Sequence, residues 1–71
     1  MRKLYFKHSD NTEDYIGEVK EEENPVALAL QDLHKRNPRY KSYYQRTWTE
    51  NSNETWIDVG SWSEFYIVRD Q

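Results

Sequence analysis

The chain has 71 residues, with 10 Lys or Arg, 13 Asp or Glu, a formal net charge of −3 and no Cys. This length predicts a single domain over residues 1–71, and the lack of Cys excludes a disulfide scaffold and any thiolate metal site. The longest apolar runs, Val26–Leu30 and Phe65–Val68, are far shorter than the roughly 20 residues that span a bilayer. No apolar leader follows the first residues, so we expect a cytoplasmic protein that makes no use of a membrane.

The first quarter of the chain predicts an antiparallel hairpin. Apolar and polar side chains alternate over Lys3–His8, which is the period of a half-buried strand. Ser9–Glu13 is rich in turn-forming residues. Asp14–Lys20 is then expected to be the partner strand, and Gly17 is expected to mark a bulge within it.

A helix is predicted after this hairpin. Asn24 is a favoured N-cap residue, and Pro25 suits the first helical position, where its missing N–H costs nothing. Asn37-Pro38 is expected to end the helix, because a residue before proline avoids the helical region. One apolar stripe recurs at helical spacing, formed by Val26, Ala29, Leu30 and Leu33. Leu28 is expected on the opposite side of the helix.

The remaining residues predict three strands, Tyr43–Glu50, Glu54–Val59 and Phe65–Arg69. Ser61 and Glu64 have the spacing of a capping box, which predicts a single helical turn between the last two strands. The last strand does not alternate, so we expect it to be central and covered on both faces. The order strand, strand, helix, strand, strand, strand predicts an α+β fold: a four- or five-stranded, mainly antiparallel sheet with one helix packed on one face.

The residues around Asn51–Asn53 also predict a register. Under a three-residue turn the opposing pairs are Trp48 with Trp56, Arg46 with Asp58, and Glu50 with Glu54. Aromatic and opposite-charge cross-strand pairs each contribute ~0.2–1 kcal/mol, whereas two facing acids are unfavourable. The first two pairs therefore favour this register.

One helix covers one face of such a sheet, and the opposite face is predicted to be aromatic. From the last strand that face receives either Tyr66 and Val68 or Phe65 and Ile67. Exposed apolar patches mark interaction sites, and Tyr, Trp and Arg dominate binding hot spots. The candidate partner surface is Tyr5, Tyr44, Arg46, Trp48, Trp56, Trp62 and Tyr66. The alternative left open is that these rings only stabilise the sheet, since aromatic residues fit a pleated surface.

Charge is segregated along the chain: residues 34–49 contain five Lys or Arg and no acid, between two acidic segments. Basic residues interleaved with aromatics are typical of single-stranded nucleic-acid grooves. The candidate residues for this alternative are Lys35, Arg36, Arg39, Tyr40 and Lys41. The isoelectric point of about 5.3 argues against it, and the same cations would equally favour the helix C-terminus and pair with the acidic segments.

Catalysis has little support. His8 and His34 lie on different predicted elements, with no placed nucleophile between them. Gly17 and Gly60 are the only glycines, so there is no glycine-rich phosphate loop. The acidic stretch that begins at Asp10 lacks the glycine that a calcium loop needs at its sixth position. We therefore expect no enzyme activity, no cofactor and no metal.

The stretches from Asn24-Pro25 through Asn37-Pro38 to Tyr44, and from Trp56 to Phe65, resemble those of small uncharacterised proteins carried by phages and prophages of Gram-positive bacteria. That resemblance implies an accessory protein that binds a host or phage macromolecule. Together with the aromatic face, it predicts a non-enzymatic module that binds a protein partner. A single-stranded nucleic-acid binder is the second interpretation, and a self-associating structural module, such as a homodimer, is the third.

Overall fold

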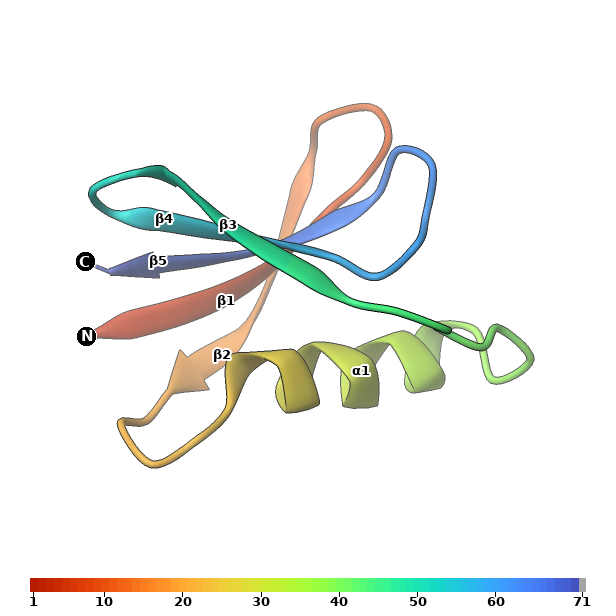
Figure 1. Ribbon diagram of the computed structural model, residues 1–71, viewed down its shortest axis with the longest axis horizontal. Coiled ribbons are helices and arrows are strands. Elements are labelled where there is room, and N and C mark those ends of the chain that lie inside the picture. The colour runs from red at the N-terminus through yellow and green to blue at the C-terminus, as the bar shows by residue number, and fades with distance from the viewer. Residues whose placement is uncertain (71) are drawn as a thin grey trace.

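A computed structural model describes residues 1–70 (Figure 1) and shows one antiparallel sheet with a helix on one side. The elements are β1 (Arg2–Lys7), β2 (Glu13–Val19), α1 (Pro25–Arg36), β3 (Arg46–Asn51), β4 (Glu54–Asp58) and β5 (Phe65–Asp70). The strand order is β2-β1-β5-β4-β3, and every neighbouring pair is antiparallel. The predicted α+β class and element order are confirmed, and β5 occupies the predicted central position.

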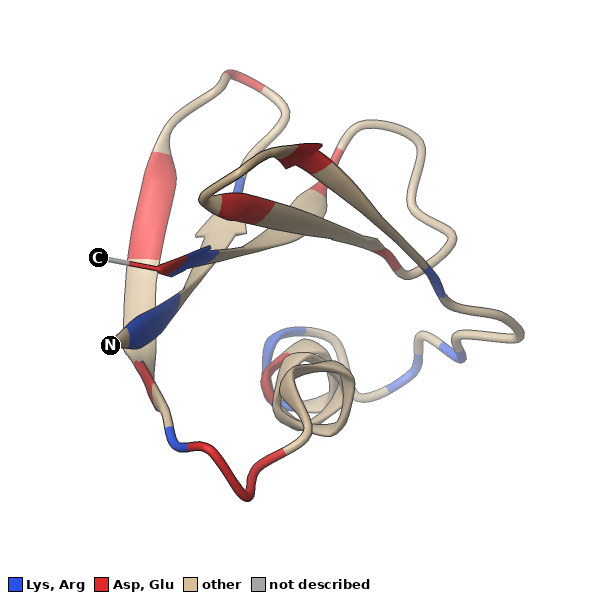
Figure 2. Ribbon diagram, turned by 60° about the vertical axis from the view of Figure 1, so that its left-hand side comes forward, with Lys and Arg blue, Asp and Glu red and all other residues tan. Residues whose placement is uncertain are grey.

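The helix has the predicted ends. Asn24 Oδ1 accepts a hydrogen bond from the Val26 N–H at 2.9 Å, and Pro25 fills the first position. At the other end the Asn37 N–H donates to the Leu33 carbonyl at 2.9 Å. Figure 2 looks nearly along α1 and shows the sheet curving over it. The helix therefore covers the inner face of the sheet and leaves the outer face uncovered.

The core lies between α1 and the inner face. Its buried residues are Leu4, Phe6, Val19, Ala29, Ile57, Val59, Tyr66 and Val68. Ala29 is fully buried, which lets the helix approach the strands closely. Leu28 also packs against this core, so its predicted position on the far side is wrong. The buried arc of α1 is wider than the predicted stripe, whose residues also pack on the core. It includes Asp32, which accepts a hydrogen bond from the Tyr66 hydroxyl at 2.8 Å.

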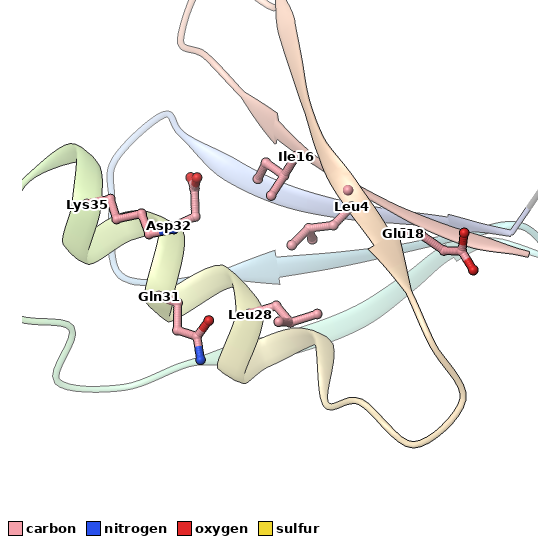
Figure 3. Close-up of a pocket in the computed structure, with 8 residues that line it drawn as sticks. Leu4, Ile16, Glu18, Leu28, Gln31, Asp32 and Lys35 are labelled. Carbon is pink, nitrogen blue, oxygen red and sulfur yellow. The ribbon is translucent and has the colours of Figure 1, made fainter.

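A bulge in β2 shapes one edge of the core. Leu4 faces Gly17 and Tyr5 faces Tyr15, so Ile16 is the extra residue beside the predicted position. Figure 3 shows Leu4, Ile16 and Leu28 in the gap between β2 and α1. This gap is a cavity of about 230 Å³ that these three residues help to line.

The second hairpin confirms two of its three predicted pairs. Trp48 faces Trp56, and Arg46 faces Asp58. The predicted pairing of Glu50 with Glu54 is wrong, because Asn51 faces Glu54 and the register shifts between Thr49 and Asn51. Glu50 is thus the extra residue of a bulge, which separates two acids that would repel each other.

The segment between β4 and β5 is a bend and not the predicted helical turn. Ser61 Oγ and Glu64 Oε1 do approach, at 3.5 Å. Gly60, however, has a φ of +91°, in the left-handed region, and reverses the chain just before these residues. The segment therefore connects two adjacent antiparallel strands without forming a helix.

Candidate functional site

The outer face carries a row of large side chains that crosses all five strands. Tyr15 faces Tyr5, Tyr5 faces Ile67, Ile67 faces Trp56, and Trp56 faces Trp48. We call these five residues the aromatic row. Ile67, at its centre, is fully buried although α1 lies on the opposite face of the sheet. The rings around Ile67 thus form a second, smaller apolar layer on the outer face.

Direct ring contacts hold both ends of the aromatic row together. The Tyr5 and Tyr15 ring centroids are 5.5 Å apart. At the other end the Trp48 and Trp56 centroids are 6.1 Å apart, and Phe65 lies 5.5 Å from Trp56 and 6.0 Å from Trp48. Aromatic pairs at such separations contribute ~0.5–1.5 kcal/mol beyond the area that they bury. These contacts hold the rings of the outer face in a fixed arrangement before any partner binds.

Paired charges border this surface on the β2 side. Arg69 donates to Glu13 at 2.8 Å and to Glu54 at 2.6 Å, with its guanidinium 5.0 Å from the Tyr5 ring centroid. The hydrogen bonds from Arg69 lower the pKa of Glu13 and of Glu54. One arginine thus links β5 to β2 and to β4 across the face.

A second ion pair borders the surface near β3. Arg46 donates to Asp58 at 3.0 Å. The pKa of Asp58 is lowered, first by the backbone N–H of Gly60, which donates to it at 2.8 Å, and then by Arg46. Lys7 adds a further cation beside the rings, with its ammonium 5.7 Å from the Trp56 ring centroid and 5.9 Å from that of Phe65. The rim is therefore charged while the centre is apolar.

Exposure separates the rings into two groups. Trp56 is half-buried, whereas Trp48 is 37% exposed at the edge of the row. Trp62, in the segment between β4 and β5, is 100% exposed. Tyr44 precedes β3 and is half exposed, with its ring centroid 5.8 Å from the Arg46 guanidinium. The structure thus gathers Tyr44, Arg46, Trp48 and Trp56 along the second hairpin.

Tyr66 does not belong to the predicted surface. It is fully buried on the inner face, and burial followed by its hydrogen bond to Asp32 raises the pKa of its hydroxyl. Phe65 takes the outer position instead. The run Phe65–Val68 has no alternation, so both faces were compatible with it.

The sequence also missed Tyr15 and Arg69 as parts of this surface. Tyr15 faces Tyr5 only because the extra residue Ile16 shifts the register of β2. A bulge of this kind leaves no signal in the sequence beyond the neighbouring Gly17. Arg69 reaches the face because it follows Ile67 by two residues on the central strand.

The basic segment is partly committed to the fold. Arg36 donates to Asp14 at 3.1 Å and to Asp32, and its guanidinium lies 4.1 Å from the Phe6 ring centroid. The Tyr40 hydroxyl donates to the Val59 carbonyl at 2.9 Å. The other three candidates, Lys35, Arg39 and Lys41, are exposed, and no ion pair to them is found within residues 1–70. In Figure 2 the blue basic positions in the segment that follows α1 lie apart from the red acidic turn before α1.

One open groove of about 550 Å³ lies beside the C-terminal end of α1. Among its lining residues, His8 contacts Asp14 through Nε2 at 2.8 Å, and Arg36 is held by two carboxylates. Over the described residues 1–70, no three His, Asp or Glu side chains gather where they would hold a metal ion. In the same part of the chain, no helix has the length and apolar character needed to cross a membrane.

Comparison with known proteins found no family model that matches the chain, no similar curated protein and no similar solved structure.

Proposed function

We propose that this chain is a small, non-enzymatic, cytoplasmic module that binds a protein through its outer sheet face. The observation that supports this most is the aromatic row on the face that α1 leaves uncovered. Protein interfaces combine an apolar centre, enriched in Tyr, Trp, Phe and Arg, with a polar rim. The outer face has this composition, with ring contacts at its centre and Arg46 and Arg69 at its rim.

Some side chains of the outer face stabilise the fold, and others are available for contact with a partner. Trp56, Phe65 and Ile67 are half-buried or buried and hold the outer layer together. Trp48 and the fully exposed Trp62 present accessible ring surface. Such rings are typical hot spots, since they supply large contact area with few rotatable bonds. The partner is expected to offer apolar side chains to the rings and carboxylates to Lys7.

The resemblance to phage proteins suggests a specific form of this proposal, in which the chain is a phage accessory factor that modulates a host protein. The test is a quantitative pull-down from a Gram-positive host lysate with three baits: the wild type, Trp48→Ala and Trp62→Ala. We expect at least one protein that the wild type captures and that Trp48→Ala loses, and Trp62→Ala reports whether the segment between β4 and β5 takes part in the same contact. His34→Ala, an exposed change on α1, is the matched control and should capture it normally. Identical captures with all baits would contradict the proposal.

Single-stranded nucleic-acid binding is the second candidate. The exposure of Lys35, Arg39 and Lys41 on adjoining segments supports it. Arg36 and Tyr40 support it less, because their polar groups already bond within the fold. Three exposed cations make a small electrostatic footprint, so we rank this function below protein binding.

A further inference from the structure

β3 is an edge strand with both faces open. Among residues 1–70 it pairs with β4 alone, and all six of its residues are exposed. Within residues 1–70, no backbone hydrogen bond from another segment reaches its outer edge. An exposed edge presents a row of N–H and C=O groups that a further strand can use. The open edge of β3 is therefore suited to pairing with a complementary strand.

The sequence of β3 is complementary to itself. In an antiparallel pairing of two copies about a two-fold axis through Trp48, residue numbers of facing pairs have a constant sum. The facing pairs are Arg46 with Glu50 of the second copy, Thr47 with its Thr49, and Trp48 with its Trp48. The symmetry axis repeats the Arg–Glu pair, so two opposite-charge pairs form at once. Trp48 Nε1 donates to Glu50 at 2.9 Å, which places Glu50 on the outer face near the indole.

Neighbouring registers lose this complementarity. If the axis passes through Thr47, Glu50 faces Tyr44 of the second copy, and if it passes through Thr49, Arg46 faces Ser52. The other sheet edge is less suitable, because β2 contains three acids and no basic residue, so no self-pairing of this strand places opposite charges opposite each other. Opposite-charge pairing thus favours the β3 edge and the register centred on Trp48.

We propose that two copies of this chain pair antiparallel through β3, centred on Trp48, and join their sheets into one continuous sheet. The two-fold axis is then perpendicular to the sheet, so both outer faces lie on the same side. The two aromatic rows meet at Trp48 and form a single surface. This dimer does not depend on the proposed function, since its formation is measured with no partner present.

The test is sedimentation equilibrium of Glu50→Lys, Arg46→Glu and their equimolar mixture beside the wild type. Each variant alone places like charges opposite each other twice, so its dimer dissociation constant should rise at least roughly tenfold. In the mixed dimer the unchanged Arg46 of one copy faces the unchanged Glu50 of the other, and the introduced lysine faces the introduced glutamate. The mixture should therefore dimerise about as well as the wild type, and high salt should weaken both.

Matched controls carry the same charge changes elsewhere. Glu22 and Arg39 are exposed and lie outside β3, so the variants Glu22→Lys and Arg39→Glu should dimerise like the wild type. Arg46→Glu also removes the ion pair with Asp58 and could lower the stability of the fold. Glu50→Lys alone then still tests the proposal, because the one hydrogen bond of the Glu50 side chain within residues 1–70 is the one from the Trp48 indole. A wild type that stays monomeric at millimolar concentration overturns the proposal. So do single variants that dimerise normally, or a folded pair of variants whose mixture stays monomeric.

Discussion

The two glycines of the chain sit in opposite environments. A Cβ added at Gly60 would lie 3.0 Å from the Tyr40 hydroxyl, and the φ of +91° is itself unfavourable for other residues. A Cβ added at Gly17 meets nothing within 4 Å, in extended backbone. Gly60→Ala should therefore lower the free energy of unfolding by ~1–2 kcal/mol. Gly17→Ala should raise it by ~0.4–1 kcal/mol, because it reduces the freedom of the unfolded chain.

Urea unfolding of the two variants beside the wild type measures both effects. Each variant is the control for the other, because the same methyl group is added at both positions. A stable Gly60→Ala variant would mean that the turn before β5 tolerates another backbone conformation.

The tryptophans differ at the same scale. Trp62→Ala should leave the melting temperature unchanged, because the side chain is 100% exposed. Trp56→Ala should lower the free energy of unfolding by up to ~3 kcal/mol, since it removes contacts to Trp48 and Phe65 and uncovers Ile67. Thermal and urea unfolding check this order. A loss of stability at Trp62 equal to that at Trp56 would show that the indole packs on the fold.

At the scale of the elements, the approach of α1 to the sheet depends on Ala29. A larger side chain there has no room, so Ala29→Leu should lower the free energy of unfolding by ~1–3 kcal/mol. Ala27→Leu is the matched control on the exposed side, where Ala and Leu have similar helix propensities and the change should be nearly neutral. Equal unfolding midpoints for the two variants would contradict the assigned face of α1.

The elements that the sequence predicts well are those fixed by local chemistry. The helix begins and ends as predicted because Asn24 and Asn37-Pro38 act within one turn of themselves. The register of the second hairpin follows from pairs only a few residues apart. What escaped prediction depends on distant contacts: Tyr66 turns inward, where Asp32, on another element, accepts a hydrogen bond from its hydroxyl.

The candidate surface shows the same division. Tyr5, Trp48 and Trp56 lie on the outer face as alternation predicts. Tyr15 joins them only through the bulge at Ile16, whose position is set by the pairing of β2 with β1. A bulge shifts the side chains on one side of it to the other face of the sheet. One extra residue in a strand therefore changes which side chains form a surface.

At the scale of the whole molecule, acid should destabilise the fold. Hydrogen bonds from Arg69 lower the pKa of Glu13 and Glu54 in the folded state. Their contribution to stability is therefore complete above the unfolded pKa of about 4.3 and is lost as the pH falls through the lower folded pKa. We expect the free energy of unfolding to be steady from about pH 7 to 5 and to fall below about pH 4.5.

Arg69→Gln isolates the cause of this acid sensitivity. The variant should be less stable at neutral pH and should lose less stability on acidification, because both carboxyls then titrate closer to their unfolded pKa. Urea unfolding at several pH values measures the slopes. Parallel curves for the variant and the wild type would assign the acid sensitivity to other carboxyls, such as Asp58.

Net charge distribution also decides between the two candidate functions. Under protein binding, the wild type shows no salt-sensitive binding to single-stranded DNA or RNA at micromolar concentration. Under the alternative, binding appears, weakens with salt and disappears in the triple variant Lys35→Gln, Arg39→Gln, Lys41→Gln. Fluorescence anisotropy over a salt series measures this. Clear salt-sensitive binding of the wild type would exchange the ranking of the two functions.

The strand order also determines how the chain must fold. Both hairpins, β1–β2 and β3–β4, can close from neighbouring residues, but within residues 1–70 they share no hydrogen-bonded edge. Of the described strands, only β5 joins them, and it pairs with β1 so that Arg2 faces Asp70. The edge of β1 that pairs with β5 therefore stays unpaired until β5, which is synthesised after both hairpins, enters between them. Contacts this far apart in sequence slow folding far more than they weaken the folded state, so the insertion of β5 is expected to set the rate at which the sheet is completed.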